Sequence, residues 1–344
     1  MKQQMRAAVL RRIGTRLKIE RLPVPEPGPG EVLIRIAACG VCHSDLHAID
    51  GDWTPGPVLP LSPGHEATGH VVARGPGVDG LRVGRAVGVP WMYSACGHCE
   101  ACLSGQETIC PEAQSTGYSK PGGYAEFMIA PARFVGRLPR GADLFGLAPI
   151  LCAGVTTYRG LKRSQARPGQ WLTVIGIGGL GHIAVQYARA MGLRVAAVDI
   201  DDKKLRLARR LGAELAFNAA RADVGPALKK RTGGSHAAIV TAVSPGAFEQ
   251  AAGLLRPGGT CVYIGVPGGS GDRIRNSISA IVGGELTIRG SNVGTREDLA
   301  EAIAFAANGL VTARIERQPL GRVNQVLERM RKGRILGRVV LEIA

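Results

Sequence analysis

The sequence predicts a two-domain α/β protein, with one β-rich domain and one domain built on a doubly wound parallel sheet. At 344 residues the chain exceeds the usual length of a single domain. Before about Pro149, short apolar runs are separated by Gly/Pro clusters, which is typical of β structure. After about Leu151, strand-length and helix-length segments alternate, which predicts a parallel sheet covered by helices on both faces.

The first domain is expected to be β throughout, as a barrel or a partly open sandwich. Its predicted strands are Met5–Leu10, Val32–Ala38, Gly69–Ala73 and Ala86–Val89. Between the first two lies the proline-rich loop Pro23–Gly30, which cannot join a central strand because proline lacks the N–H group that the ladder needs.

The second domain is expected to alternate strands with helices. Its strands are predicted at Trp171–Ile175, Arg194–Val198, Ala237–Val240 and Cys261–Gly265. Its helices are predicted at Gly181–Met191, Lys203–Leu211 and Ala247–Leu255, the last closed by Pro257-Gly258-Gly259. Beyond about Arg289 we expect a helix at Glu297–Asn308 and a final strand, Arg338–Ile343, that returns to the first domain. Residues 1–149 and 289–344 are therefore assigned to the first domain, with a metal-binding lobe at 91–110, and residues 150–288 to the second.

The net charge of +16 has two interpretations, a nucleic-acid surface or an Arg-rich composition without function. The basic residues are scattered, and the nearest approach to a run, Arg329 to Arg334, is short. Because nucleic-acid binders cluster their charge, we expect no nucleic-acid partner. The excess positive charge would still favour an anionic dinucleotide.

The protein is expected to have no membrane partner and to occupy a reducing compartment. No secretory signal is expected, since residues 1–4 lead directly into the first strand. The uncharged stretch Gln170–Ala188 has the length of a membrane span, but its glycines favour a strand, a turn and a helix. Eight cysteines, four of them at metal spacing, indicate a reduced, cytoplasmic compartment.

A glycine-rich turn with the G-x-G-x-x-G spacing follows one predicted strand and opens the next helix, the context that a dinucleotide site requires. Gly176 would permit the tight turn, Gly178 the approach of the pyrophosphate, and Gly181 close packing of helix on strand. The free N–H groups of the helix N-terminus suit phosphates. The cofactor-binding residues assigned here are Gly176, Gly178, Gly179, Leu180 and Gly181. The alternative is a glycine-rich turn without a ligand.

An acid follows this turn at the end of the second strand. Asp199 lies 23 residues past Gly176, where a carboxylate can bind the ribose hydroxyls of the adenosine. A carboxylate repels a 2′-phosphate, and Asp201 and Asp202 add to that repulsion. The sequence therefore predicts NAD rather than NADP.

Four cysteines, Cys96, Cys99, Cys102 and Cys110, are separated by gaps of two, two and seven residues. Four thiolates at such spacing predict a closed, structural zinc site that pins a lobe too small for its own core. The alternatives are buried thiols packed as small apolar groups, or a redox dithiol.

A second candidate metal set, Cys42, His65 and Cys152, is dispersed along the chain. Cys42 and His65 each lie in a Gly-flanked turn. Two thiolates and one imidazole, with a fourth position open, are typical of a catalytic zinc. Spacing alone cannot join these residues, and His65 could equally be an ordinary loop histidine.

In these motifs the chain resembles the zinc-containing medium-chain alcohol dehydrogenases over nearly its whole length, the yeast-type and bacterial propanol-preferring enzymes above all. The resemblance is carried by Cys39–Trp53, Gly64–Gly69, Trp91–Cys110, Leu151–Tyr158, Val174–Gly181 and Gly333–Val340. It implies a GroES-like catalytic domain followed by a Rossmann domain that binds NAD. It also implies two zinc ions per subunit, one structural and one held by Cys42, His65 and Cys152 for catalysis.

The resemblance also implies roles for the residues around the catalytic zinc. Glu66 lies beside the metal, and Asp45 orients the ligand histidine. Ser44 and His47 are expected to carry the proton of the alcohol out of the site. The alternative for His47 is a solvated surface histidine.

Further cofactor contacts are implied by the same resemblance, at His43, Thr156, Lys204, Val266, Ser291, Val293 and Arg338. His43 and Arg338 match positions that contact the pyrophosphate. Many relatives have Arg at the first of these positions, so His43 would hold phosphate less firmly and release of the cofactor is expected to be faster.

Trp53 and Trp91 match walls of the substrate pocket. Two indoles leave little volume, so short primary alcohols, oxidised to aldehydes in a reversible reaction, are the expected substrates. Other hypotheses are a polyol or other secondary-alcohol dehydrogenase of the same family, a zinc-free quinone reductase, and a zinc ribbon that binds nucleic acid. A homotetramer is expected by analogy only.

Overall fold

The computed structural model describes residues 3–268 and 273–343, which form two compact units. Unit 1 comprises Met1–Val155, Thr295–Ala307 and Ala313–Ala344, and unit 2 comprises Thr156–Gly294 and Asn308–Thr312. The first two crossings between the units, at 155/156 and 294/295, lie a few residues later in the chain than the predicted boundaries at 149/150 and 288/289, and Asn308–Thr312 returns once more to unit 2. The domain assignment from the sequence stays a prediction.

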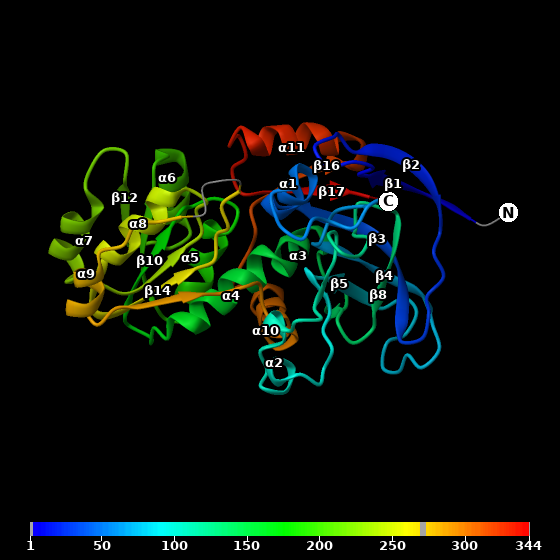
Figure 1. The fold of residues 1–344 in the computed structure, drawn as a ribbon, viewed down its shortest axis with the longest axis horizontal. Coiled ribbons are helices and arrows are strands. Elements are labelled where there is room, and N and C mark those ends of the chain that lie inside the picture. Colours follow the sequence, from blue (N-terminus) through cyan, green and yellow to red (C-terminus); the bar gives the residue numbers. More distant parts are fainter. Residues whose placement is uncertain (1–2, 269–272, 344) are drawn as a thin grey trace. The chain divides into compact units, whose positions relative to one another are not determined.

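Unit 1 is organised by a seven-stranded sheet in the order β16-β17-β3-β4-β5-β9, with β8 also pairing with β3 (Figure 1). Its strands are β3 (Glu31–Val41), β4 (Ala67–Arg74), β5 (Ala86–Val89), β8 (Phe127–Pro131), β9 (Gly136–Arg137), β16 (Ile315–Pro319) and β17 (Arg338–Glu342). The long strand β3 pairs antiparallel with β4, β8 and β17. The predicted return of the final strand to the first part of the chain is therefore confirmed.

Two small sheets complete the β structure of unit 1. The first pairs β1 (Gln4–Val9) with β2 (Lys18–Pro23), and the second pairs β6 (Met92–Ser94) with β7 (Gln114–Ser115). Strand β2 was not predicted, and it includes Pro23, the first residue of the predicted loop Pro23–Gly30, as its last residue. The main core of the unit includes the buried side chains Val32, Ile34 and Ile36 of β3.

The prediction that the chain is β throughout before Pro149 is wrong, because three short helices interrupt it: α1 (His43–Asp50), α2 (Glu100–Leu103) and α3 (Leu144–Leu147). Helix α1 begins where Asp45, its third residue, accepts the backbone N–H of Cys42 at 2.8 Å. It ends at Gly51, whose φ of 75° suits glycine. Two further helices, α10 (Arg296–Ala307) and α11 (Val323–Arg331), come from the C-terminal part of the chain.

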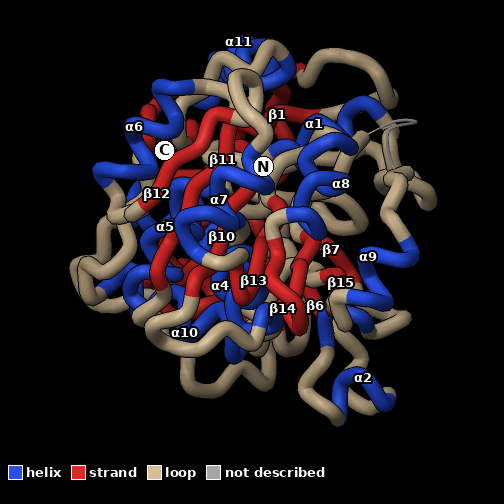
Figure 2. Tube along the Cα trace, turned by 90° about the vertical axis from the view of Figure 1, so that its left-hand side faces the viewer, coloured by secondary structure: helices blue, strands red, loops and turns tan. Residues whose placement is uncertain are grey.

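Unit 2 contains a six-stranded parallel sheet in the order β12-β11-β10-β13-β14-β15 (Figure 2). Its strands are β10 (Trp171–Ile175), β11 (Arg194–Asp199), β12 (Leu215–Asn218), β13 (Ser235–Val240), β14 (Leu255–Tyr263) and β15 (Thr287–Gly290). Its helices are α4 (Ala153–Ser164), α5 (Gly181–Ala190), α6 (Asp202–Arg210), α7 (Val224–Thr232), α8 (Pro245–Gly253) and α9 (Ile278–Gly283), the first of which begins in unit 1. Numbered from β10, this order is 3-2-1-4-5-6, in which the direction of winding reverses between β10 and β13.

One predicted boundary in unit 2 is wrong. The segment Pro257-Gly258-Gly259 was expected to close a helix, but α8 has already ended at Gly253 and the segment lies inside β14. The pairing of β14 with β13 is interrupted there, between Ser235/Leu255 and Ala237/Thr260. Proline offers no N–H group to the neighbouring strand, so the ladder breaks at this point and resumes at Thr260.

The uncharged stretch Gln170–Ala188 forms strand β10, a turn and the first part of α5, as predicted. Among the described residues, no single helix is both long enough and apolar enough to cross a bilayer. One bent pair, Leu144–Leu151 with Ala153–Ser164, meets the requirements of length and composition when the two segments are taken together.

Candidate functional site

A buried group in unit 1 brings together Cys42, His65, Glu66 and Cys152, whose ligand atoms lie within 4.8 Å of one another. The Sγ atoms of Cys42 and Cys152 are 3.9 Å apart, although 110 residues separate them in the chain. Cys42 precedes α1, His65 and Glu66 precede β4, and Cys152 precedes α4. The sequence predicted that Cys42 lies in a turn. The structure places it instead at the start of helix α1.

The chemistry of this group fits a zinc ion. The Nε2 atom of His65 is buried and has no hydrogen-bond partner among the described residues. On the other side of the ring, Nδ1 lies 3.2 Å from Oδ1 of Asp45. An unpaired buried nitrogen is costly unless a ligand completes it. Two thiols and an imidazole that present their free atoms to one point form a donor set that zinc prefers.

The thiols and the imidazole of this group shift one another's pKa values. A hydrogen bond from Cys152 lowers the pKa of Cys42 well below its usual value, and the same contact raises that of Cys152. Burial opposes a charged His65, but Asp45 and Cys42 outweigh it and raise the pKa of His65 to about 10. Binding of zinc would release protons from this group, because the metal takes thiolates and a neutral imidazole.

Glu66 is fully buried behind the cysteines and hydrogen-bonds to the guanidinium of Arg338 on β17. Burial raises the pKa of Glu66 to about 7, even though Arg338 acts in the opposite direction. The carboxylate fits because residue 40 is glycine, where an added Cβ would lie 1.8 Å from Oε2 of Glu66. The sequence predicted Arg338 as a phosphate contact and gave no sign of this ion pair.

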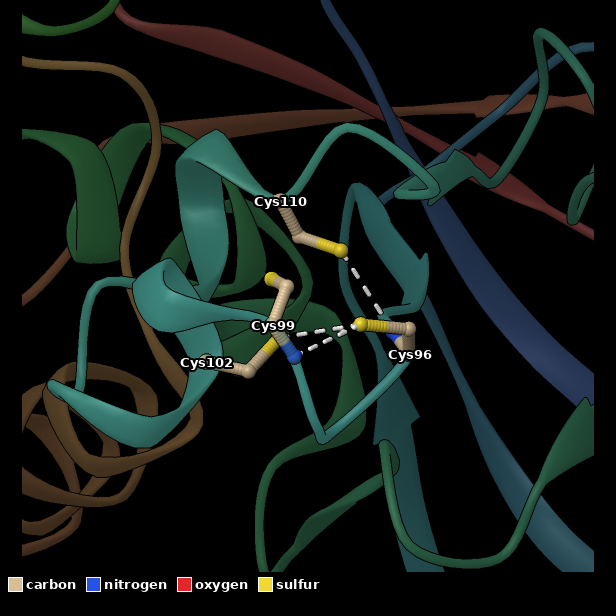
Figure 3. Close-up of side chains that lie close together, drawn as sticks. All are labelled: Cys96, Cys99, Cys102 and Cys110. Atoms are coloured by element: carbon tan, nitrogen blue, oxygen red, sulfur yellow. Dashed lines mark hydrogen bonds between the residues drawn. The ribbon is translucent and has the colours of Figure 1, made fainter.

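The four cysteines of the lobe, Cys96, Cys99, Cys102 and Cys110, form a second group with sulfur atoms within 4.8 Å of one another (Figure 3). The backbone N–H of Cys96 donates to Sγ of Cys110 at 3.4 Å, and that of Cys99 to Sγ of Cys96 at 3.3 Å. Helix α2 of this lobe has no buried residue. A lobe without a core of its own needs a staple, and four converging thiols fit a closed zinc site.

The glycine turn of unit 2 lies between β10 and α5, at the carboxyl end of β10. The direction of winding of the sheet reverses between this strand and β13. Gly176 has φ of +90°, and a Cβ on Gly181 would lie 1.8 Å from the carbonyl oxygen of Gly176. A Cβ on Gly178 would meet nothing within 4 Å, so space is open above that residue. These three environments suit the predicted tight turn, close packing and approach of a phosphate, respectively.

Asp199 closes the turn from the end of β11. Its Oδ2 accepts the backbone N–H of Ile177 at 2.6 Å, and its Oδ1 accepts that of Asp201 at 3.0 Å. The side chain is buried, with 8% of its surface exposed. The carboxylate therefore holds the glycine turn, a role that the sequence did not indicate.

Comparisons with known proteins place the chain among zinc-binding dehydrogenases. Residues 28–140 match the alcohol dehydrogenase GroES-like domain, and residues 179–308 match the zinc-binding dehydrogenase family. An alcohol dehydrogenase of Geobacillus stearothermophilus is 52% identical over 339 residues, which cover 98% of this chain and 100% of the relative. The alcohol dehydrogenase of Moraxella sp. (strain TAE123) is 51% identical over 338 residues, which cover 98% of this chain and 99% of the relative.

A solved structure agrees with the sequence matches. The alcohol dehydrogenase of the hyperthermophilic archaeon Aeropyrum pernix has a TM-score of 0.90 at 35% identity, covering 98% of this chain and 99% of that one. The chain belongs to the zinc-binding alcohol dehydrogenase family. The predicted fold class, a GroES-like domain with a parallel-sheet Rossmann domain, is confirmed, and so is the prediction of an alcohol dehydrogenase.

In this alcohol dehydrogenase, three aromatic rings pack together, and one of them contacts His65 of the buried group. Trp53 and Trp91 meet edge to face, with ring centroids 6.0 Å apart. Tyr118, which the sequence did not single out, lies 5.7 Å from the first and 5.9 Å from the second. The ring of Trp91 reaches to 4.9 Å from His65. Only the scarcity of aromatic residues could have drawn attention to Tyr118.

His47 of the dehydrogenase is buried on α1, with 7% of its surface exposed, so it is not a solvated surface histidine. Its Nδ1 lies 2.7 Å from Oδ2 of Asp52, which the sequence did not single out. Its Nε2 is buried and has no hydrogen-bond partner in the described part of the chain. Ser44, one helical turn earlier, places its hydroxyl 3.8 Å from Sγ of Cys42. His43, the first residue of this helix, is exposed.

The remaining predicted cofactor residues follow the ends of strands in unit 2. Lys204 lies on α6 after β11, Val266 follows β14, and Ser291 and Val293 follow β15. The carboxyl ends of parallel strands share one edge of a sheet, so these residues and the glycine turn belong to the same edge. Thr156 lies on α4 and is buried. The assignment of all these residues to a cofactor stays a prediction.

Proposed function

We propose that this alcohol dehydrogenase oxidises small primary alcohols to aldehydes, and reduces the aldehydes in the reverse direction, by hydride transfer to and from NAD. The observation that carries the proposal is the convergence of Cys42, His65 and Cys152 beside an aromatic wall. A donor set of this kind leaves a fourth position for substrate. Bulky rings next to that position leave room for a short chain.

Two zinc ions belong to the proposal. Cys42, His65 and Cys152 would hold one, with Glu66 beside them, and the four cysteines of the lobe would hold the other. When bound, the first ion supplies a Lewis acid that lowers the pKa of the substrate hydroxyl, and NAD supplies the hydride acceptor. Asp45 fixes the ring of His65 through Nδ1, so that Nε2 faces the thiols.

The proton of the alcohol leaves through the polar residues of α1 in this proposal. Ser44 lies next to Cys42, and His47 follows it by one turn with its Nε2 unpaired among the described groups. Asp52 holds Nδ1 of His47 and is itself exposed. A histidine held on one nitrogen by a carboxylate can accept a proton on the other and pass it towards water.

NAD is proposed in preference to NADP because a carboxylate, that of Asp199, lies at the end of β11. The two backbone N–H groups that it accepts fix the carboxylate in place. A fixed negative charge disfavours a 2′-phosphate. A cytoplasmic homotetramer without a nucleic-acid or membrane partner completes the proposal.

The test is NAD-linked turnover across a series of alcohols, with zinc counted per chain. We expect ethanol, propanol and butanol to be oxidised faster than secondary alcohols or polyols, NAD to be preferred to NADP, and two zinc ions per chain. A polyol or secondary alcohol that outran the short primary alcohols would favour the alternative, a polyol or secondary-alcohol dehydrogenase of the same family.

A further inference from the structure

Asp45 connects the two segments that carry Cys42 and His65. The carboxylate is buried, with 1% of its surface exposed. Its Oδ2 accepts the backbone N–H of Cys42 at 2.8 Å, and its Oδ1 accepts that of Gly64 at 3.2 Å. The same Oδ1 lies 3.2 Å from Nδ1 of His65. The orientation of one carboxylate therefore fixes where both ligand-bearing segments lie.

A buried tyrosine, Tyr124, completes the shell around this carboxylate. Its hydroxyl donates to Oδ2 of Asp45 at 2.7 Å, and none of its surface is exposed. Burial, followed by the charge of Asp45, raises the pKa of Tyr124 well above its usual value, so the phenol keeps the proton that it donates. Two donors thus hold Oδ2, which leaves Oδ1 turned towards His65 and Gly64.

The ring of Tyr124 is itself fixed against the segment that carries His65. A Cβ on Gly64 would lie 2.5 Å from Cδ1 of Tyr124, so the ring packs directly on this glycine. The backbone N–H of Tyr124 donates to the carbonyl of Pro63 at 3.0 Å, and that of Gly123 to the carbonyl of Gly64 at 2.8 Å. The hydroxyl therefore has a fixed position relative to the histidine.

We propose that Tyr124 is a positioning residue for the buried metal group, which acts on the metal through Asp45 and His65. Its hydroxyl prevents rotation of the Asp45 carboxylate and so keeps the Nε2 atom of His65 aimed at the point shared with the thiols. A direct partner of a ligand histidine, as Asp45 is here, commonly changes metal affinity by about 10–100-fold, and Tyr124 lies one hydrogen bond behind that partner. This inference rests on the zinc site of the proposed function.

The test compares the variant Tyr124→Phe with the wild type as zinc-loaded, full-length proteins, by following release of zinc to a chelator. We expect one of the two zinc ions to leave about tenfold faster in Tyr124→Phe. This is the lower end of the range for a direct partner of a ligand histidine, because Tyr124 lies one hydrogen bond further from the metal than Asp45 does. The zinc of the four cysteines should leave at the wild-type rate.

Tyr263→Phe is the matched control. Tyr263 lies on β14 of unit 2, outside both metal groups, and its hydroxyl donates to the carbonyl of Phe248 at 3.5 Å. This change also removes one phenolic hydroxyl, and it should leave both release rates unchanged. Equal acceleration in the two variants, or acceleration of both zinc ions in Tyr124→Phe, would mean a general loss of stability and would overturn the inference.

A double-mutant cycle tests whether Tyr124 acts through Asp45. In the Asp45→Asn background, where the acceptor carboxylate is gone, Tyr124→Phe should change zinc release less than twofold, whereas independent effects would multiply. Multiplied effects, or a wild-type rate in Tyr124→Phe alone, would overturn the inference. If the wild type holds zinc only at the four cysteines, the proposed function itself fails, and the role of Tyr124 falls with it.

Discussion

At the scale of residues, the proposed function assigns the limit on substrate size to three packed rings, Trp53, Trp91 and Tyr118. Trp91 lies nearest to His65, with its centroid 4.9 Å from that of the histidine, and Trp53 and Tyr118 enclose it. Each ring removes volume from the space beside the metal group. Discrimination by a hydrophobic wall is worth about 1–3 kcal/mol per methylene, so a single ring can reverse a preference for chain length.

We expect Trp91→Ala to raise kcat/KM for hexanol relative to ethanol by about tenfold or more, because the removed indole makes room for several methylenes. The measurement is steady-state kinetics over primary alcohols of two to eight carbons. Tyr118→Phe is the control, since it keeps the ring and loses only the hydroxyl that donates to the carbonyl of Pro55 at 2.7 Å. An unchanged chain-length profile in Trp91→Ala would show that this indole does not line the substrate site.

At the scale of elements, two glycines of the turn between β10 and α5 are expected to have different roles. Gly181 should matter for stability and Gly178 for cofactor binding. Gly181→Ala places a Cβ where the carbonyl of Gly176 lies, 1.8 Å away, so strand and helix must move apart. Gly178→Ala adds a Cβ with nothing within 4 Å. The first change should lower the free energy of unfolding by about 1–3 kcal/mol. The second should leave stability unchanged and weaken NADH binding, because the new methyl group occupies the space left for a phosphate.

These two glycine variants are compared by urea unfolding and by fluorescence titration with NADH. We expect Gly181→Ala to be the less stable of the two proteins and Gly178→Ala to be defective in NADH binding alone. Equal losses of stability, or full NADH affinity in Gly178→Ala, would contradict the assignment of the turn.

Helix α2 of the lobe has no buried residue, so in the proposed function this part of the lobe is held by the zinc-bound thiols. Cys102→Ser should therefore release one zinc ion per chain and expose residues 91–110 to limited proteolysis, while the other zinc remains. Cys261→Ser, a buried thiol of unit 2, is the control and should lose no zinc. The checks are zinc content by mass spectrometry and the position of the proteolytic cut. Retention of both ions in Cys102→Ser would contradict a structural role for this group.

At the scale of the whole molecule, features that lie within a short stretch of chain could be predicted from the sequence. Groups of residues that are distant in the chain and meet only in the fold could not. The bounds of β10, and the spacing of the four cysteines that meet in one group, were evident because each lies within a short stretch. Cys42 and Cys152, 110 residues apart, were joined only by resemblance, since spacing carries no information about contacts made through the fold.

The missed features have the same physical cause. Helix α1 was overlooked because its start depends on a hydrogen bond from Cys42 to Asp45, hidden in a motif that suggested a turn. The salt bridge of Glu66 with Arg338 joins residues 272 positions apart and requires β17 to lie beside β3. Tyr124 gave no signal at all, since its role depends on which carboxylate its hydroxyl meets.

The central claim is that three distant side chains of unit 1 bind one zinc ion, and it is tested most directly by anomalous diffraction at the zinc absorption edge. The account predicts two anomalous peaks per chain in crystals of the wild-type protein. One should lie among Sγ of Cys42, Sγ of Cys152 and Nε2 of His65, and the other among the four cysteines of the lobe. A peak at the lobe alone, with the buried group free of metal in a zinc-replete preparation, would contradict the account.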